Sequence, residues 1–451
     1  MAWNPLLKKS FYVVAAGAWT WALFLVLLLN PWFQRHALYA HTIHSGFWHN
    51  VSNPEEFGFA KGQVQPFTLK TADGESLFCW HVLPLDVYLE HENEIVQKTT
   101  GLVEDLKETV GYRILKKDEG SKVVINFHGN AGHVAQGHRP STYRSISSIP
   151  HTHLLTCDYR GFGKSTLLKA PNIPTESGLI TDGISLINYI LADLGHPSSR
   201  TVLLGQSLGT AVTTASALYF TDPESTLLPT DITPPQDAVQ SKGGFAGIVL
   251  VSPFPSLPVL LETYRIFGIL PILSPLRGYP KIAKFVNARI VDRWPTLERL
   301  TALLAPSGKG DSRGGSGCDG VRLTLLHARN DQDIDFRLSE DIYATLESQI
   351  LSSSSSSESH SHSSVLEERR SIHGGERVKR GAFAYRRVED AESTKNDGGG
   401  KSVELEIVRY GGHNEVVGFA QVSLAVRRAF REAEAEAEEG KARFRVGLDV
   451  E

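Results

Sequence analysis

Short apolar segments separated by helical patterns are the feature that most restricts how this chain can fold. These segments are nearly continuous in hydrophobic residues and cover 122–127, 152–157, 201–204, 245–251 and 321–326. Residues with helical periodicity, such as 178–194, lie between most of them. Apolar strands that alternate with helices are typical of a parallel sheet covered on both faces. We therefore expect an α/β protein with a mostly parallel, doubly wound sheet, preceded by a hairpin of 65–70 and 77–82.

Composition narrows the class of protein further. The 451 residues are 41% hydrophobic, which is enough for a sizeable core, and the net charge of -4 is small and mixed. A nucleic-acid binder would show a basic footprint, so we expect no nucleic-acid partner. Three cysteines, Cys79, Cys157 and Cys318, are too few for a disulfide framework and lack zinc-site spacing. We expect Cys79 and Cys157 to be core thiols, and we predict no metal and no cofactor.

The N-terminus contains a candidate membrane segment. Residues 11–29 carry no charge over 19 positions and follow Lys8 and Lys9. A helix of that length spans ~28 Å, close to the ~30 Å hydrocarbon core of a bilayer. A cleaved signal peptide and a buried helix are the alternatives, but the apolar run is long for a signal peptide and no good cleavage site follows it. We therefore expect a single-pass anchor.

The orientation of that anchor follows from charge. The two lysines and the amino terminus outweigh Arg35, so the positive-inside rule puts the N-terminus in the cytosol and the bulk of the chain in the lumen, with the endoplasmic reticulum as the expected membrane. Asn50 begins the only Asn-x-Ser sequon without proline and is a glycosylation candidate on the lumenal side.

Changes in composition suggest the domain boundaries. We expect an anchor over 1–35, a linker over 36–64, one main domain over 65–431 and an acidic tail over 432–451. The polar stretch at about 90–120 suggests a surface insertion. Residues 307–320 and 352–400 are rich in Gly, Ser and charge, so both are predicted to be disordered inserts.

Gly205-Gln-Ser-Leu-Gly209 is the motif that carries chemistry. It follows the apolar run 201–204 and opens a helical run at 210–219, which is the strand–turn–helix context of a nucleophile elbow. Such a turn holds its serine in a strained conformation and packs so tightly that glycine is needed on either side. The motif predicts the α/β-hydrolase fold with Ser207 as nucleophile; a passive serine in a glycine-rich turn is the alternative.

A serine nucleophile needs a base, and the base needs a carboxylate to orient it. In this fold the acid follows the nucleophile along the chain and lies just past a strand end. Asp331, after the run 321–326, is the best candidate, although Asp333 and Asp335 are rivals and a loop carboxylate can also cap a helix.

The base must come after the acid in the chain. His360, His362 and His373 lie in low-complexity sequence, which cannot hold catalytic geometry. His413 follows the strand-like run 403–410 and the turn Gly411-Gly412, so we predict it as the base.

An oxyanion hole needs two backbone N–H groups, one directly after the nucleophile and one from the loop after the third strand. We assign these to Leu208 and Asn130. Small residues in His128-Gly-Asn-Ala-Gly132 allow the backbone to approach a substrate. His128 is expected to be structural, because the base role is filled.

Together these segments resemble a known family. The run 128–132, Asp158-Tyr-Arg-Gly-Phe-Gly163 with Ser165, the run 205–210, Ser252-Pro-Phe254 and the cap-like 284–287 are similar to the membrane-bound, lumen-facing monoacylglycerol and lysophosphatidylserine lipases of the α/β-hydrolase-domain family. The resemblance implies a Ser-Asp-His triad, no metal, and hydrolysis of lipid monoesters.

The apolar, proline-rich stretch at about 253–295 occupies the position of a cap above the nucleophile, where it suits an acyl chain; a buried helical hairpin has the same pattern. The sequence thus predicts a serine hydrolase of lipid carboxylic esters, with an acyl-serine intermediate. A protein acyl-thioesterase or peptidase of the same fold is the first alternative. A non-catalytic membrane scaffold is the second.

Overall fold

A ten-stranded sheet forms the centre of the molecule in the computed structural model, which describes residues 5–43, 48–98, 101–238, 244–266, 270–305, 320–355, 378–380, 383–390 and 400–448. The strand order is β1-β2-β4-β3-β5-β6-β9-β12-β11-β10. Strands β4 (Thr152–Cys157), β3 (Lys122–Phe127), β5 (Thr201–Gln206), β6 (Gly247–Val251), β9 (Val321–Ala328) and β12 (Lys401–Val408) run parallel to their neighbours. The strands beyond them at both edges are antiparallel.

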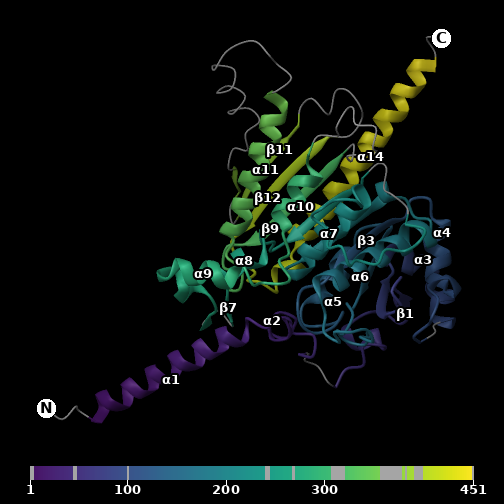
Figure 1. Ribbon diagram of the computed structural model, residues 1–451. Helices are drawn as coiled ribbons and strands as arrows, with labels where there is room; N and C mark the ends of the chain where they lie inside the picture. Colours follow the sequence, from purple (N-terminus) through teal and green to yellow (C-terminus); the bar gives the residue numbers. More distant parts are fainter. Residues whose placement is uncertain are drawn as a thin grey trace.

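Helices cover both faces of this sheet (Figure 1). One apolar layer includes α6 (Glu176–Asn188), α7 (Leu208–Thr221), α10 (Thr296–Leu303) and α11 (Arg337–Ser355). The other layer includes α5 (Arg139–Ser147) and α14 (Ala420–Leu448). Alternate strand residues enter the two layers: Val123 and Ile125 pack in the first and Val124 in the second. The expected doubly wound α/β fold is confirmed, and β3 and β4 have the predicted bounds.

The predicted N-terminal hairpin is also confirmed, with β1 (Val64–Lys70) paired to β2 (Ser76–Val82). The polar stretch that follows is more than a surface insertion. It contains α3 (Leu85–Gln97) and α4 (Val110–Lys117), which share a small apolar cluster including Val87, Ile95 and Ile114. Charged residues are so frequent in both helices that their apolar faces are hard to recognise in the sequence, and the cluster was therefore not predicted.

Two α-helices and a short 3₁₀ helix, Pro54–Phe57, precede the sheet in the described part of the chain. Helix α1 (Pro5–Leu27) has the length and apolar composition needed to cross a membrane, and most of it is exposed. Helix α2 (Pro31–Leu38) starts at a proline after Asn30, whose side chain accepts a hydrogen bond from the Trp32 N–H. Thus α2 runs past the expected anchor boundary at residue 35.

The expected cap region holds α8 (Leu257–Thr263), the short strands β7 (Arg265–Ile266) and β8 (Leu270–Pro271), a 3₁₀ turn at Ser274–Gly278, and α9 (Pro280–Asn287). It lies at the end of the sheet where α1 joins the domain (Figure 1).

The prediction of a disordered insert throughout 352–400 is wrong. Strands β10 (Val378–Arg380) and β11 (Phe383–Glu389) extend the sheet, and β11 pairs along its length with β12. Arg386 and Arg387 form ion pairs with Glu347 and Glu404, so polar contacts replace the apolar content that the sequence lacks. The other predicted insert, at 307–320, lies almost wholly outside the described residues.

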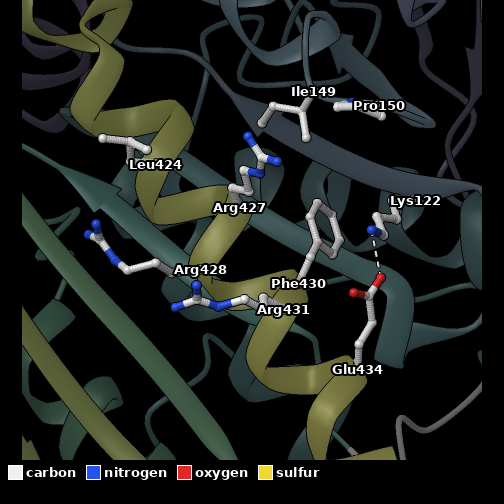
Figure 2. Close-up of a pocket in the computed structure, with 9 residues that line it drawn as sticks. All are labelled: Lys122, Ile149, Pro150, Leu424, Arg427, Arg428, Phe430, Arg431 and Glu434. Atoms are coloured by element: carbon white, nitrogen blue, oxygen red, sulfur yellow. Dashed lines mark ion pairs between the residues drawn. The ribbon is translucent and has the colours of Figure 1, made fainter. Parts of the chain in front are cut away.

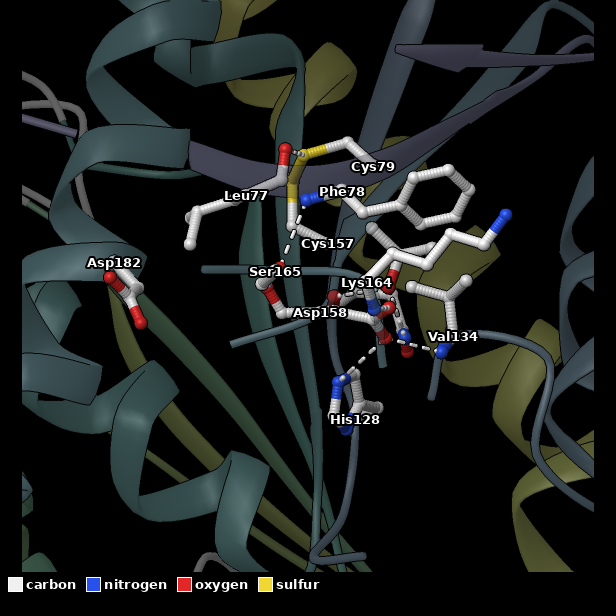
Figure 3. The surroundings of a disulfide bond; sticks show 12 residues. Leu77, Phe78, Cys79, His128, Val134, Cys157, Asp158, Lys164, Ser165 and Asp182 are labelled. Atoms are coloured by element: carbon white, nitrogen blue, oxygen red, sulfur yellow. Dashed lines mark hydrogen bonds and ion pairs between the residues drawn. A yellow bond between two sulfur atoms is a disulfide. The ribbon is translucent and has the colours of Figure 1, made fainter. Parts of the chain in front are cut away.

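The expectation that Cys79 and Cys157 are free core thiols is also wrong, because they form a disulfide (Figure 3). The two residues are directly opposite each other on the antiparallel strands β2 and β4, with Cα atoms 4.0 Å apart. They are 78 positions apart in sequence, so only the strand pairing brings them together.

Candidate active site

Ser207 lies at a sharp turn between β5 and α7. Its φ of 53° and ψ of -122° are a conformation that most residues avoid, as expected of an elbow that presents the side chain away from the sheet. The turn packs tightly: a Cβ added to Gly209 would lie 2.0 Å from the carbonyl oxygen of Phe127. Glycine at this position is therefore a steric requirement of the turn.

The structure brings Ser207, His413 and Asp331 together. His413 Nε2 lies 3.0 Å from Ser207 Oγ, and His413 Nδ1 lies 2.8 Å from Asp331 Oδ2. His413 follows β12 and Asp331 follows β9, which are adjacent parallel strands, so their carboxyl ends meet at one edge of the sheet. The remaining histidine candidates, His360, His362 and His373, lie outside the described residues.

Asp331 is buried within a set of donors. Its Oδ1 accepts hydrogen bonds from the backbone N–H groups of Asp333 and Ile334, both at 2.9 Å. Ser252 Oγ donates to Oδ2 at 3.0 Å, and His327 Nε2 lies 3.2 Å from the same oxygen. Burial alone would raise the pKa of Asp331, but the hydrogen bonds with His327 and His413 outweigh it and hold that pKa well below its usual range. The carboxylate is thus ionised and fixed.

Asp331 in turn sets the protonation of His413. Burial lowers the pKa of the imidazole, but the hydrogen bond to Asp331 and its negative charge raise it by more, so the net shift is upward. An ionised carboxylate at Nδ1 also favours the tautomer in which Nε2 is free to accept the serine proton.

The rival acids have other surroundings. Asp335 Oδ1 accepts a hydrogen bond from the backbone N–H of Arg337, at the start of α11, so it is a helix cap. The pKa of Asp333 is raised, and burial of its carboxyl group is the main cause. Neither side chain forms the hydrogen bond with His413 that Asp331 forms.

The two predicted oxyanion residues flank the serine. Leu208 is the first residue of α7, so its N–H has no carbonyl one turn earlier in the helix to bind. Asn130 follows β3, in a loop packed so closely against the elbow that a Cβ added to Gly129 would lie 3.5 Å from the Cβ of Ser207. These positions leave both N–H groups available to a ligand near Ser207.

Arg139, which the sequence did not single out, organises the loop that contains Asn130. Its Nη2 donates to the carbonyl oxygens of Gly129, Asn130 and Ala131, at 2.8, 3.1 and 2.9 Å. Holding these carbonyls on one side turns the N–H groups toward the other. Because Arg139 is the first residue of α5, no local motif identified its role.

The side chain of Asn130 joins this loop to the segment after α2. Asn130 Nδ2 donates to the Leu38 carbonyl oxygen at 2.5 Å, and Asn130 Oδ1 accepts from the Ala40 N–H at 3.2 Å. Tyr39, between them, is buried and donates to Asp292 at the base of the cap. Residues expected to be a linker therefore contact the candidate site directly.

His128 is a buried part of the same support. Burial and the nearby Arg139 lower its pKa well below the usual range, so the ring is neutral. Its Nδ1 hydrogen-bonds the Gly129 carbonyl at 2.7 Å, and Nε2 lies 3.8 Å from Asp158 Oδ1. Figure 3 shows the ring facing Asp158. These contacts fit the structural role expected for His128.

One groove on the molecule lies away from Ser207. A groove of about 500 Å³ runs between α14 and the loop before β4, lined by Lys122, Phe430, Arg427 and Arg431 among others (Figure 2). It contains none of the residues around Ser207, so the candidate site is not this groove.

Comparison with known proteins agrees with the geometry. No protein-family model matches the chain. It is 23% identical over 341 residues to "Lysophosphatidylserine lipase ABHD12" of Xenopus tropicalis, a match that covers 76% of this chain and 72% of the relative. It is 32% identical to the protein of the same name from Gallus gallus, covering 49% and 46%, and 26% identical to "Protein bem46" of Schizosaccharomyces pombe, covering 44% and 52%. The chain thus spans about half the length of the last two relatives.

Solved structures with a similar chain path include an α/β hydrolase from Vibrio vulnificus, with 16% identity, a TM-score of 0.43 and coverage of 71% of this chain and 81% of that one. Est1E from Butyrivibrio proteoclasticus has 11% identity and a TM-score of 0.39, with 82% and 99% covered.

The sheet order and the serine elbow define an α/β hydrolase. In sequence the chain is similar to lysophosphatidylserine lipases of the α/β-hydrolase-domain family.

Proposed function

We propose that this chain is a membrane-anchored serine esterase that cleaves single-chain lipid esters through an acyl-serine intermediate. The observation that carries the proposal is the hydrogen-bonded series from Ser207 through His413 to Asp331, at 3.0 and 2.8 Å, on a strained elbow. An imidazole and a buried carboxylate in line with a serine are the groups that activate it as a nucleophile, and a serine with only a structural role does not require them.

The reaction follows from the positions of these atoms. His413 Nε2 takes the proton of Ser207 as Oγ attacks the ester carbonyl. The N–H groups of Asn130 and Leu208 then stabilise the oxyanion. Protonated His413 gives its proton to the leaving alcohol, and a water activated by the same imidazole releases the fatty acid from the serine. Asp331 holds the imidazole in the productive tautomer throughout.

The proposed substrate class is a lipid with one acyl ester, such as lysophosphatidylserine or a monoacylglycerol. The names of the relatives support this choice, and so do two features of the chain. The apolar stretch 253–295 holds the chain position of a cap, where it would suit an acyl chain, and α1 would keep the enzyme at the membrane in which such lipids reside.

The proposed location of the domain is the lumen of the endoplasmic reticulum. Lys8 and Lys9 favour a cytosolic N-terminus. The Cys79–Cys157 disulfide supports the same orientation, because disulfides persist in oxidising compartments. Asn50 is exposed and can carry a glycan there.

Replacing the nucleophile tests the chemistry. Ser207→Ala should lower hydrolysis of a lysophospholipid by roughly 10³-fold or more, because no other group can form the acyl intermediate. Labelling by a fluorophosphonate probe should be lost, while the thermal unfolding transition stays in place. Ser348→Ala, at an exposed serine of α11, is the matched control and should label normally. Full labelling of Ser207→Ala would reject this residue as the nucleophile.

A further inference from the structure

The last turns of α1 are attached to the cap. Trp21 Nε1 donates a hydrogen bond to the carbonyl oxygen of Ile272 at 3.1 Å. Leu25 is buried in a cluster with Leu273, just before the 3₁₀ turn, Leu276 in that turn and Val286 of α9. The cap is thus held against the anchor helix itself.

These contacts have a geometrical consequence for a chain anchored by α1. Trp21 and Leu25 both lie within the uncharged run of residues 11–29. Trp21 precedes the end of that run by eight residues, which is ~12 Å along a helix axis. A cap that touches both residues must therefore reach at least into the headgroup region of the leaflet that α1 leaves.

The cap surface on this side is apolar and open. Tyr279, Ile282 and Phe285 are 63%, 49% and 48% exposed. They are three residues apart and so share one face of α9, while Val286 faces the contact with Leu25. Exposed aromatic and aliphatic side chains grouped on one short helix need a partner to remove them from water.

Helix α2 continues the same surface. Its Trp32 and Phe33 are exposed, and Gln34 Nε2 donates to the Arg289 carbonyl at 2.7 Å, just beyond the end of α9. Arg35 forms an ion pair with Asp292 at 3.0 Å. Figure 1 shows α2 and α9 on the side of the domain where α1 joins it.

The charges on this surface are basic. Residues 274–293 contain five basic side chains and one acidic one, Asp292, which Arg35 already neutralises; the five are Arg277, Lys281, Lys284, Arg289 and Arg293. Lysines beside apolar residues on a short helix are typical of a helix at a membrane surface, where the ammonium groups reach the phosphates. The charge pattern favours an anionic leaflet over a second copy of this basic surface, which would be repelled.

We propose that α9 and the aromatic pair Trp32–Phe33 form a membrane-docking surface that is inserted into the leaflet next to α1. The occupant is the anionic phospholipid leaflet, and the lipid substrate passes from it under the cap without crossing bulk water. The segment Leu38–Ala40, which begins five residues after Phe33, contacts Asn130, so the docking surface and the candidate site are close along the chain. The proposal rests on the membrane anchor proposed above, but not on the chemistry of Ser207.

Depth measurement tests the proposal directly. The full chain, with Cys318→Ala so that only the introduced thiol reacts, is reconstituted in nanodiscs containing anionic phospholipid. Spin labels at Ile282→Cys or Phe285→Cys should be accessible to oxygen and shielded from a water-soluble nickel complex. Leu89→Cys on α3, equally apolar and 73% exposed, is the matched control and should show the opposite pattern. Nickel accessibility at 282 and 285 equal to that at 89 would overturn the proposal. So would shielding of 282 and 285 that persists in detergent, if cross-linking there captures a dimer, because a second copy would then cover this surface.

A kinetic measurement provides the second arm. The double variant Ile282→Asp with Phe285→Asp should raise KM for a membrane-resident monoacyl ester by about tenfold, since the apolar face no longer inserts. Hydrolysis of a water-soluble short-chain ester should stay within about twofold, because the variant residues do not contact the site. Equal loss on both esters would overturn the proposal. The spin-label result does not depend on whether Ser207 is the nucleophile. The docking surface and the esterase chemistry can therefore be rejected independently of each other.

Discussion

The two flanks of the sheet are stabilised in different ways and contribute different parts of the site. The flank β1-β2-β4 is joined by a disulfide, and its apolar interior includes the buried Trp80. The flank β12-β11-β10 is held by ion pairs among Arg387, Glu404 and Glu432. The first flank adjoins β3, whose loop contains Asn130, whereas the second includes β12, which leads to His413. A disulfide thus stabilises the flank next to the proposed oxyanion loop, and ion pairs stabilise the flank that leads to the proposed base, His413.

The largest effect is expected at Asp331, which follows β9, the strand next to the second flank. Asp331→Asn should lower kcat/KM by roughly 10³–10⁴-fold, because an amide NH₂ facing Nδ1 favours the wrong tautomer of His413. The residual activity should also change its pH dependence. His413 acts as a base only when neutral, and Asp331 raises its pKa. Without that charge the pKa falls, so the acidic limb of the kcat/KM profile should move to lower pH.

The control is Asp335→Asn, which changes an exposed helix cap and should leave kcat/KM within about twofold. An acidic limb that stays in place in Asp331→Asn would contradict the assignment of this carboxylate.

The next effect concerns the covalent flank. The Cys79→Ser, Cys157→Ser double variant should lower the free energy of unfolding by about 2–4 kcal/mol, because the bond closes a loop of 78 positions in the unfolded chain. Urea denaturation of the detergent-solubilised chain measures it.

The redox state of Cys79 and Cys157 also tests the orientation of the domain in the membrane. Protein from cells should add a maleimide–polymer tag at Cys79 and Cys157 only after reduction, and glycosidase should increase its gel mobility unless Asn50→Gln is present. Free thiols together with an unglycosylated chain would mean that the domain faces the cytosol. The thioesterase alternative would then move ahead of the lumenal lipase.

The smallest effect is expected on the ion-paired flank. Glu404 is 3% exposed and binds Arg387 and the Tyr385 hydroxyl. Glu404→Gln should lower the free energy of unfolding by about 2 kcal/mol, because it leaves a partly buried guanidinium without its full charge partner. Glu432→Gln removes a more exposed partner of the same arginine and should cost less than about 1 kcal/mol. Equal losses in the two variants would show that burial of Glu404 is not what matters.

Much of the fold could be predicted because its signals are local. The bounds of β3 and β4 follow from continuous apolar runs, and the elbow follows from glycines that the turn requires on either side of Ser207. Asp331 and His413 could be proposed because the carboxyl ends of parallel strands lie at the same edge of the sheet. The sequence order of acid and base completed that inference.

What could not be predicted depends on contacts between distant segments. The disulfide requires knowledge that β2 pairs with β4, and the role of Arg139 requires the path of the loop 129–131. Strand β11 could not be predicted because much of its stability comes from ion pairs of Arg386 and Arg387 with distant partners, in addition to the buried Val388. Ser252 was noted only as part of the Ser252-Pro-Phe254 segment, and its hydrogen bond to Asp331 could not be predicted.

The hydrogen bonds from Asn130 to Leu38 and Ala40 decide where the anchor can be removed. A soluble version of this enzyme would ordinarily begin at the first strand, Val64, and discard everything before it. Such a cut would take away two of the partners that orient the Asn130 side chain, along with the Tyr39 contact that joins this segment to the cap. A protein that starts at Pro31 keeps all of these groups and omits α1. For expression and crystallisation, a shortened chain should therefore begin at α2, because removing α1 leaves these three contacts in place.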